Sequence, residues 1–78
     1  MIFSEFKKLV SPDQHVSVST VMDDGKTIEH GLTIDHNKAI GDKESFPDQA
    51  WFNTLEVRWI GVYHDILLIE LLEKEGES

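Results

Sequence analysis

The chain has 78 residues and no cysteine, so it has room for one hydrophobic core and lacks any disulfide framework or cysteine-based zinc site. Fifteen acidic and seven basic side chains give a net charge of −8, which opposes contact with nucleic-acid phosphates and anionic membranes. The start MIFSEFKKLV is too charged for a signal peptide, and the longest apolar run, ILLI, is far short of the roughly 20 residues of a membrane span, so we expect a soluble cytoplasmic protein.

A short helix is predicted at the amino terminus. Its apolar stripe at helical spacing consists of Ile2, Phe6, Leu9 and Val10. Ser4 is placed to cap this helix, since serine is favoured at helix starts. The sequence SPD at 11–13 should end it, because the residue before Pro12 is pushed out of the helical region.

The apolar spacing then changes to two, which predicts a first β-hairpin in HVSVSTVMDDGKTIEHGLTID. One face of its first strand carries Val16, Val18, Thr20 and Met22, and the alternating residues of its second strand are Ile28, His30, Leu32 and Ile34. A three-residue loop, Asp23-Asp24-Gly25, places apolar residues opposite one another, with Gly25 as the left-handed residue. In that register the opposed pairs are Val16–Leu32, Val18–His30 and Thr20–Ile28.

The middle of the chain is less regular. DHNK at 35–38 is typical of a turn, and Lys38–Gly41 is predicted as a short third strand. SFPDQAWF predicts a helical turn near residues 46–52, because Ser45 and Asp48 have capping-box spacing.

The most apolar stretch, LEVRWIGVYHDILLIELLEK at 55–74, favours a second hairpin over a helix. A helix would contain Gly61 and many β-branched and aromatic residues. A hairpin with the loop Tyr63-His64-Asp65 places apolar residues opposite apolar residues, and its one charged pair joins opposite charges. The pairs are Val62–Ile66, Gly61–Leu67, Ile60–Leu68, Trp59–Ile69, Arg58–Glu70 and Val57–Leu71. Residues 72–78 are predicted to be a frayed acidic tail.

Both faces of this hairpin are then apolar. One face carries Val57, Trp59, Leu67, Ile69 and Leu71, and the other carries Ile60, Val62, Ile66 and Leu68. A sheet covered on one side only would leave the second face in water, so it needs a cover from the short helices or from another chain. The sequence as a whole predicts a small α+β domain with a mostly antiparallel sheet of four or five strands, two hairpins and a short amino-terminal helix.

No motif for catalysis or for a cofactor is present. Two histidines adjoin aspartates, at 35–36 and 64–65, but their spacing fits no local metal motif, and both pairs lie in predicted turns. The serines lack a nucleophile elbow, and the scattered glycines form no phosphate-binding loop. The lysines show no cluster beyond Lys7 and Lys8. We therefore expect no enzyme, no cofactor, no metal and no direct nucleic-acid binding.

The pattern instead favours a small acidic protein-interaction module that binds a second copy or another protein through the carboxy-terminal hairpin. The candidate interaction residues are Trp51, Trp59, Ile60, Val62, Tyr63, Ile66 and Leu68. The closing pattern V-x-W-I-x-V-Y-x-D-x-L-x-I-x-L resembles, in a general way, small phage and mobile-element proteins, and this resemblance implies no activity.

Two alternatives stay open. Residues 1–39 carry six acids and four bases (−2), whereas residues 40–78 carry nine and three (−6). An acidic inhibitor that imitates the charge of nucleic acid would use this second half to bind a basic protein. Its phosphate surrogates would be Asp42, Glu44, Asp48, Glu70, Glu73, Glu75 and Glu77. The other alternative is a metal-dependent activity of the turns that hold His36 and His64.

Overall fold

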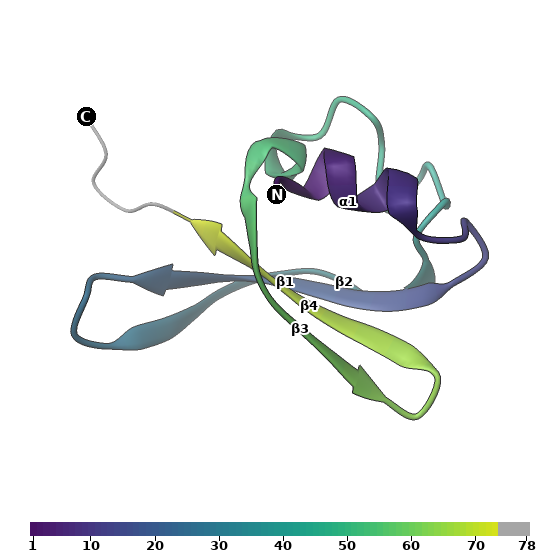
Figure 1. Ribbon diagram of the computed structural model, residues 1–78. Coiled ribbons are helices and arrows are strands. Elements are labelled where there is room, and N and C mark those ends of the chain that lie inside the picture. Colours follow the sequence, from purple (N-terminus) through teal and green to yellow (C-terminus); the bar gives the residue numbers. More distant parts are fainter. Residues whose placement is uncertain (74–78) are drawn as a thin grey trace.

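Two β-hairpins lie side by side and form one mixed sheet, with the helical segments on one of its faces (Figure 1). This architecture is that of a computed structural model, which describes residues 1–73. The elements are α1 (Phe3–Leu9), β1 (His15–Asp23), β2 (Ile28–Ala39), the 3-10 helix η1 (Trp51–Thr54), β3 (Glu56–Tyr63) and β4 (Ile66–Glu73). The predicted α+β class with two hairpins is confirmed. The predicted tail at 72–78 begins too early, since β4 runs to Glu73, and its remainder lies outside the described residues.

The strand order β2-β1-β4-β3 places the first strand of one hairpin beside the last strand of the other. These two central strands run parallel, in register from Val16 opposite Leu67 to Met22 opposite Glu73. Both are rich in β-branched and aliphatic residues, as expected for strands with neighbours on both sides. Each hairpin is therefore left with its other strand, β2 or β3, at an edge of the sheet.

The core lies between the central strands and the helical layer. From the sheet, Val16, Val18, Ile69 and Leu71 are buried, as is Thr20 on the same face, so the predicted inward face of β1 is confirmed for its first three positions. From the other side come the rings of Phe3, Phe6, Phe46 and Phe52. The Phe3 ring lies 6.1 Å from Phe46 and 5.9 Å from Phe52, distances typical of paired aromatic rings.

The amino-terminal helix is confirmed, but its capping and its buried face differ from the prediction. Its N-cap residue is Ile2, and no side chain bonds to the first turn, so Ser4 does not cap it. Phe3 and Phe6 are its buried residues, while Leu9 is 70% exposed. A helix of seven residues has only two turns, and the large rings at spacing three determine which side faces the core.

The segment between β2 and η1 corrects two predictions. Residues 35–38 form no turn and Lys38–Gly41 is no separate strand, because β2 continues through Ala39 with Asn37 in the left-handed region (φ 55°). The helical turn is the 3-10 helix at Trp51–Thr54, later than predicted. Asp48, assigned to the capping box, instead accepts a 2.7 Å bond from Lys43.

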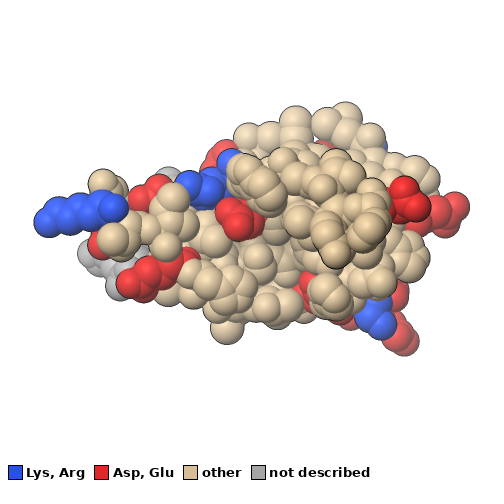
Figure 2. Space-filling model, turned by 90° about the horizontal axis from the view of Figure 1, so that it is seen from below, with Lys and Arg blue, Asp and Glu red and all other residues tan. Residues whose placement is uncertain are grey.

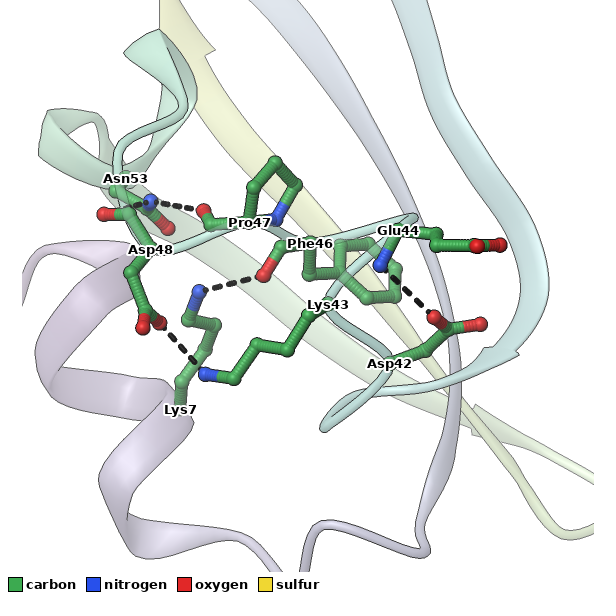
Figure 3. A network of polar contacts seen from close by, with 8 residues as sticks. All are labelled: Lys7, Asp42, Lys43, Glu44, Phe46, Pro47, Asp48 and Asn53. Carbon is green, nitrogen blue, oxygen red and sulfur yellow. Dashed lines mark hydrogen bonds and ion pairs between the residues drawn. The ribbon is translucent and has the colours of Figure 1, made fainter.

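Polar contacts fasten this segment to α1 and to η1 (Figure 3). Lys7 Nζ donates to the carbonyl of Phe46 at 3.3 Å, and the Asn53 amide nitrogen donates to the carbonyls of Pro47 and Asp48 at 2.8 and 2.9 Å. The ring of Phe46 is fully buried among the core aromatics. One aromatic anchor and a few backbone-directed bonds thus hold an otherwise irregular segment over the sheet.

The first hairpin has a longer loop than predicted. Asp23 pairs with Ile28, so the loop contains four residues, 24–27. The carboxylate of Asp24 accepts bonds from the backbone N–H groups of Thr27 and Lys26, and these bonds hold the pKa of Asp24 below its usual range. Gly25 does have a positive φ of 90°, as predicted.

The predicted register of this hairpin is wrong, since Val16 pairs with Lys38 and Val18 with Asp35. Three irregularities lie between the paired strands, each of which adds a residue to β2. His30 pairs with Val21 and is exposed, so it does not lie on the apolar face. The prediction maximised apolar pairs, but β2 is an edge strand, and bulges there remove the need for a strict alternation.

The second hairpin has a shorter loop than predicted. Its two loop residues are 64–65, with His64 in the left-handed region (φ 56°) that such tight turns require. The observed pairs are Glu56–Leu72, Val57–Leu71, Trp59–Glu70, Ile60–Ile69, Gly61–Leu68, Val62–Leu67 and Tyr63–Ile66. Only Val57–Leu71 agrees with the prediction, because an irregularity at Arg58 restores that register. The predicted ion pair nevertheless forms, with Arg58 Nη1 3.3 Å from Glu70 Oε1.

The shift by one residue exchanges side chains between the two faces of the hairpin, so the predicted faces are wrong. Since directly paired residues share a face, Ile60, Val62, Leu67 and Ile69 lie on the side of α1. Trp59, Tyr63, Ile66 and Leu68 lie on the opposite side. Each face keeps several apolar residues, so the hairpin is apolar on both sides.

The register makes a prediction about stability, because Ile60 and Ile69 lie directly opposite each other but are 45% and 1% exposed. In Ile69→Val a buried methyl group is lost, at an expected cost of about 0.5–1.5 kcal/mol. The matched control Ile60→Val should stay within about 0.5 kcal/mol of the parent. Urea unfolding of the two variants in dilute solution measures both values. Equal costs at the two positions would contradict the observed burial.

Candidate interaction surface

The outer half of the β3–β4 hairpin slopes away from the helical layer (Figure 1). Near its base, Leu55 and Val57 pack against the core. Farther along β3, four large side chains are exposed: Trp59 by 46%, Ile60 by 45%, Val62 by 69% and Tyr63 by 61%. We call residues 59–68 the hairpin tip.

The hairpin tip contains all but one of the candidate interaction residues. Trp59, Tyr63, Ile66 and Leu68 share the face away from α1, and Ile60 and Val62 share the other face. Trp51 lies apart, in η1 of the helical layer, where its ring meets Phe52 at 5.8 Å with half of its surface exposed. The sequence therefore identifies the apolar surface but assigns its residues to the wrong sides.

The sheet face away from α1 has a broad area of uncharged side chains (Figure 2). Acidic side chains lie toward the two ends of this view, and a further acidic side chain lies beside basic ones left of its centre. On this face the Trp59 indole lies over Gly61, so close that a Cβ atom at position 61 would be 2.3 Å from Trp59 Cη2. The glycine thus gives the ring a flat backbone on which to rest.

A groove of about 250 Å³ runs beside this ring. Its apolar side includes Trp59 and Leu68, and its polar side includes Ser17, Ser19, His30 and His36 of β1 and β2. The residue spacing did not reveal this groove, because the bulges that bring His30 and His36 to it break the alternation along β2.

The groove contains one serine–histidine contact, with Ser17 Oγ 3.2 Å from Nδ1 of His36. Ser17 Oγ also accepts the backbone N–H of Asn37 at 3.0 Å. A nucleophile–base pair needs a third group that orients the base. Within residues 1–73 no carboxylate bonds to the other ring nitrogen of His36. The contacts of Ser17 with His36 and Asn37 instead hold the bulged part of β2 against β1.

The two His–Asp segments are not brought together. His36 lies in β2 beside Ser17, whereas His64 lies in the β3–β4 loop with its ring 4.3 Å from that of Tyr63. Within the described chain, no group of three histidine, aspartate or glutamate side chains is arranged to hold a metal ion.

Two of the acids proposed as phosphate surrogates form ion pairs. Asp48 bonds to Lys43, which holds the pKa of this carboxyl below its usual range, and Glu70 bonds to Arg58. Glu75 and Glu77 lie outside the described residues. Lys43 lines one groove together with Lys7 and Lys8, between α1 and the segment that follows β2. The fold thus brings Lys43 to two lysines that are far from it in the sequence.

At seven residues, α1 is far too short to cross a bilayer, and no other helix of residues 1–73 is long and apolar enough. Comparison with known proteins adds no relative: no protein-family model, no curated protein and no solved structure matches the chain.

The contact of Trp59 with Gly61 yields a test of the surface. In a Trp51→Phe background, where Trp59 is the single tryptophan, Gly61→Ala should push the indole off the strand into water. We expect a red shift of the tryptophan emission and stronger quenching by acrylamide. Val62→Ala, on the opposite face, is the control and should leave both unchanged. An unchanged spectrum in Gly61→Ala would show that the ring does not lie over the glycine.

Proposed function

We propose that this chain is a small protein-interaction module that binds its partner through the hairpin tip. The observation that carries the proposal is that Trp59, Ile60, Val62 and Tyr63 are all exposed by 45% or more in one continuous strand. Scattered exposed apolar residues are ordinary, but here they follow one another along an edge strand, with tryptophan and tyrosine on one face and isoleucine and valine on the other, and such aromatic residues are typical of binding surfaces.

The helical layer covers little of the tip: Leu67 packs against the core, but the large side chains of β3 from Trp59 to Tyr63 stay exposed. Its rings, from Phe3, Phe6, Phe46 and Phe52, pack over the base of the sheet. A binding partner could cover the tip and remove its apolar side chains from water. Each Å² of apolar surface buried in this way stabilises the complex by about 25 cal/mol. A reducing compartment such as the cytoplasm suits a chain without cysteines.

The chemistry of the tip favours apolar docking over catalysis. Residues 59–63 have no charged side chain, and the groove beside them lacks an oriented nucleophile or a metal site among the described residues. The acidic alternative has less support, because Asp48 and Glu70 are already paired with cations.

Site-specific photo-crosslinking tests the proposal. Tyr63 is replaced by benzoylphenylalanine, an aromatic residue of similar shape, in the cells that naturally produce the protein. We expect a discrete cross-linked product at this position, because the exposed ring lies on the proposed binding surface. Leu9 is the matched control, since it is 70% exposed but lies on α1. Equal yields at the two positions, or none at either, would contradict the proposal.

Salt dependence separates apolar docking from attraction to a basic partner. The cross-linking at Tyr63 is repeated in lysates adjusted to about 50 mM and about 500 mM salt, since the Debye length falls severalfold over this range. We expect the yield to hold or rise, because contacts between uncharged side chains are barely screened. A steep decline would favour the acidic inhibitor, whose attraction to a basic surface is screened by ions.

A further inference from the structure

The two edges of the sheet differ in how far they are protected against further pairing. Edge strands expose unpaired backbone groups, and proteins usually protect them with bulges, charges or short length. β2 has three irregularities against β1 and carries Glu29, Asp35 and Lys38. β3 has a single irregularity, at Arg58, and is then regular and uncharged through Tyr63.

The amino terminus covers only the base of the β3 edge. Ile2 forms a bridge with Glu56, and the N–H of Val57 bonds to the carbonyl of Met1 at 2.8 Å. Beyond Val57, no other part of residues 1–73 pairs with the outer side of β3. Because hydrogen bonding alternates along an antiparallel strand, every second residue from 58 to 63 directs its N–H and C=O to this open edge.

We propose that the edge of β3 pairs with β3 of a second copy, antiparallel and centred on Gly61, to give a twofold dimer with a continuous eight-stranded sheet. This inference rests on the proposed function and names its partner. In this register Trp59 lies opposite Tyr63 of the other copy, Ile60 opposite Val62, and Gly61 opposite Gly61. Every pair is uncharged and matches itself under the twofold axis, which an isologous interface requires.

The shape of the molecule permits this pairing. Paired residues of two antiparallel strands share a face, so the Trp59–Tyr63 pairs would form on the side away from α1. The Ile60–Val62 pairs would form on the side of α1, at the part of the hairpin that slopes away from the helical layer (Figure 1). Both exposed faces of β3 thereby gain an apolar neighbour from one contact.

The charge favours a modest affinity. Two chains of −8 repel each other at long range, while the strands that meet carry no charge from 59 to 63. An interface of one strand from each copy belongs to the small class that associates weakly. We therefore expect a monomer–dimer equilibrium that shifts toward the dimer as salt is added.

Two cysteine variants test the register, and the chain has no other cysteine. In the proposed dimer, positions 60 and 62 of opposite copies are direct neighbours with Cα atoms about 4.5–5.5 Å apart, within disulfide reach. Identical positions are diagonal neighbours about 7–8 Å apart, beyond it. A mixture of Ile60→Cys and Val62→Cys under mild oxidation should thus give several-fold more of the mixed disulfide than of either symmetric one. Ile60→Cys mixed with Leu9→Cys is the control and should show no such preference.

Light scattering provides the second measurement. The parent chain should rise with concentration from 8.9 kDa toward twice that mass. Val62→Lys should remain a folded monomer, because a lysine on an edge strand opposes pairing, while Leu9→Lys, with the same change of charge and similar exposure, should still dimerise.

A monomer at every concentration, or a dimer without the mixed-disulfide preference, would overturn the inference. Neither result touches the proposed function, which fails only if the Tyr63 and Leu9 cross-linking yields are alike. A cross-link from Tyr63 to a different protein, with the purified chain monomeric, would retain the docking surface and reject the second copy as its occupant.

Discussion

The parallel pairing of β1 with β4 determines most other features of this molecule. It joins the two hairpins through their most apolar strands and directs Val16, Val18, Ile69 and Leu71 to one face. Because each hairpin contributes one strand to the centre, each must also contribute one to an edge. The position of β2 and β3 at the two edges of the sheet follows from that single arrangement.

At the β2 edge, bulges and charges make the strand a poor template for another chain. The same bulges bring Ser17, His36 and His30 to one groove, so the polar site beside Trp59 is a by-product of edge protection. At the β3 edge the sequence from Trp59 to Tyr63 has neither device. A protected edge and an unprotected one in the same small sheet argue that the open edge has a use.

The sequence predicts local patterns well and registers poorly. Both hairpins and the inward face of Val16, Val18 and Thr20 follow from a period of two, which depends only on neighbouring residues. The register of the second hairpin depends on a backbone conformation, the left-handed His64, for which an apolar-matching rule carries no information. The register of the first depends on bulges that are tolerated because β2 is an edge strand, and strand order is a long-range property.

The candidate surface shows the same division. Its composition follows from the sequence, because the run from Trp59 to Leu68 is apolar on both faces in either register. Which side chains share a face does not, since a shift of one residue exchanges every one of them. The exposure of the tip depends on how much of the sheet α1 and η1 cover. That coverage is set by the packing of the phenylalanine rings in the core, a long-range property that the sequence pattern does not give.

Charge and apolar surface act over different distances in this chain. A net charge of −8 keeps copies apart in dilute solution, where the separation between molecules makes the summed field matter most. The uncharged strand 59–63 acts only at contact, when backbone groups and side chains meet. In the dimer that we propose, the general repulsion would favour contact through the β3 edge, because the strand from 59 to 63 is the uncharged part of that edge. The acidity and the apolar hairpin separately favour two different functions, and the proposed pairing would use both of them.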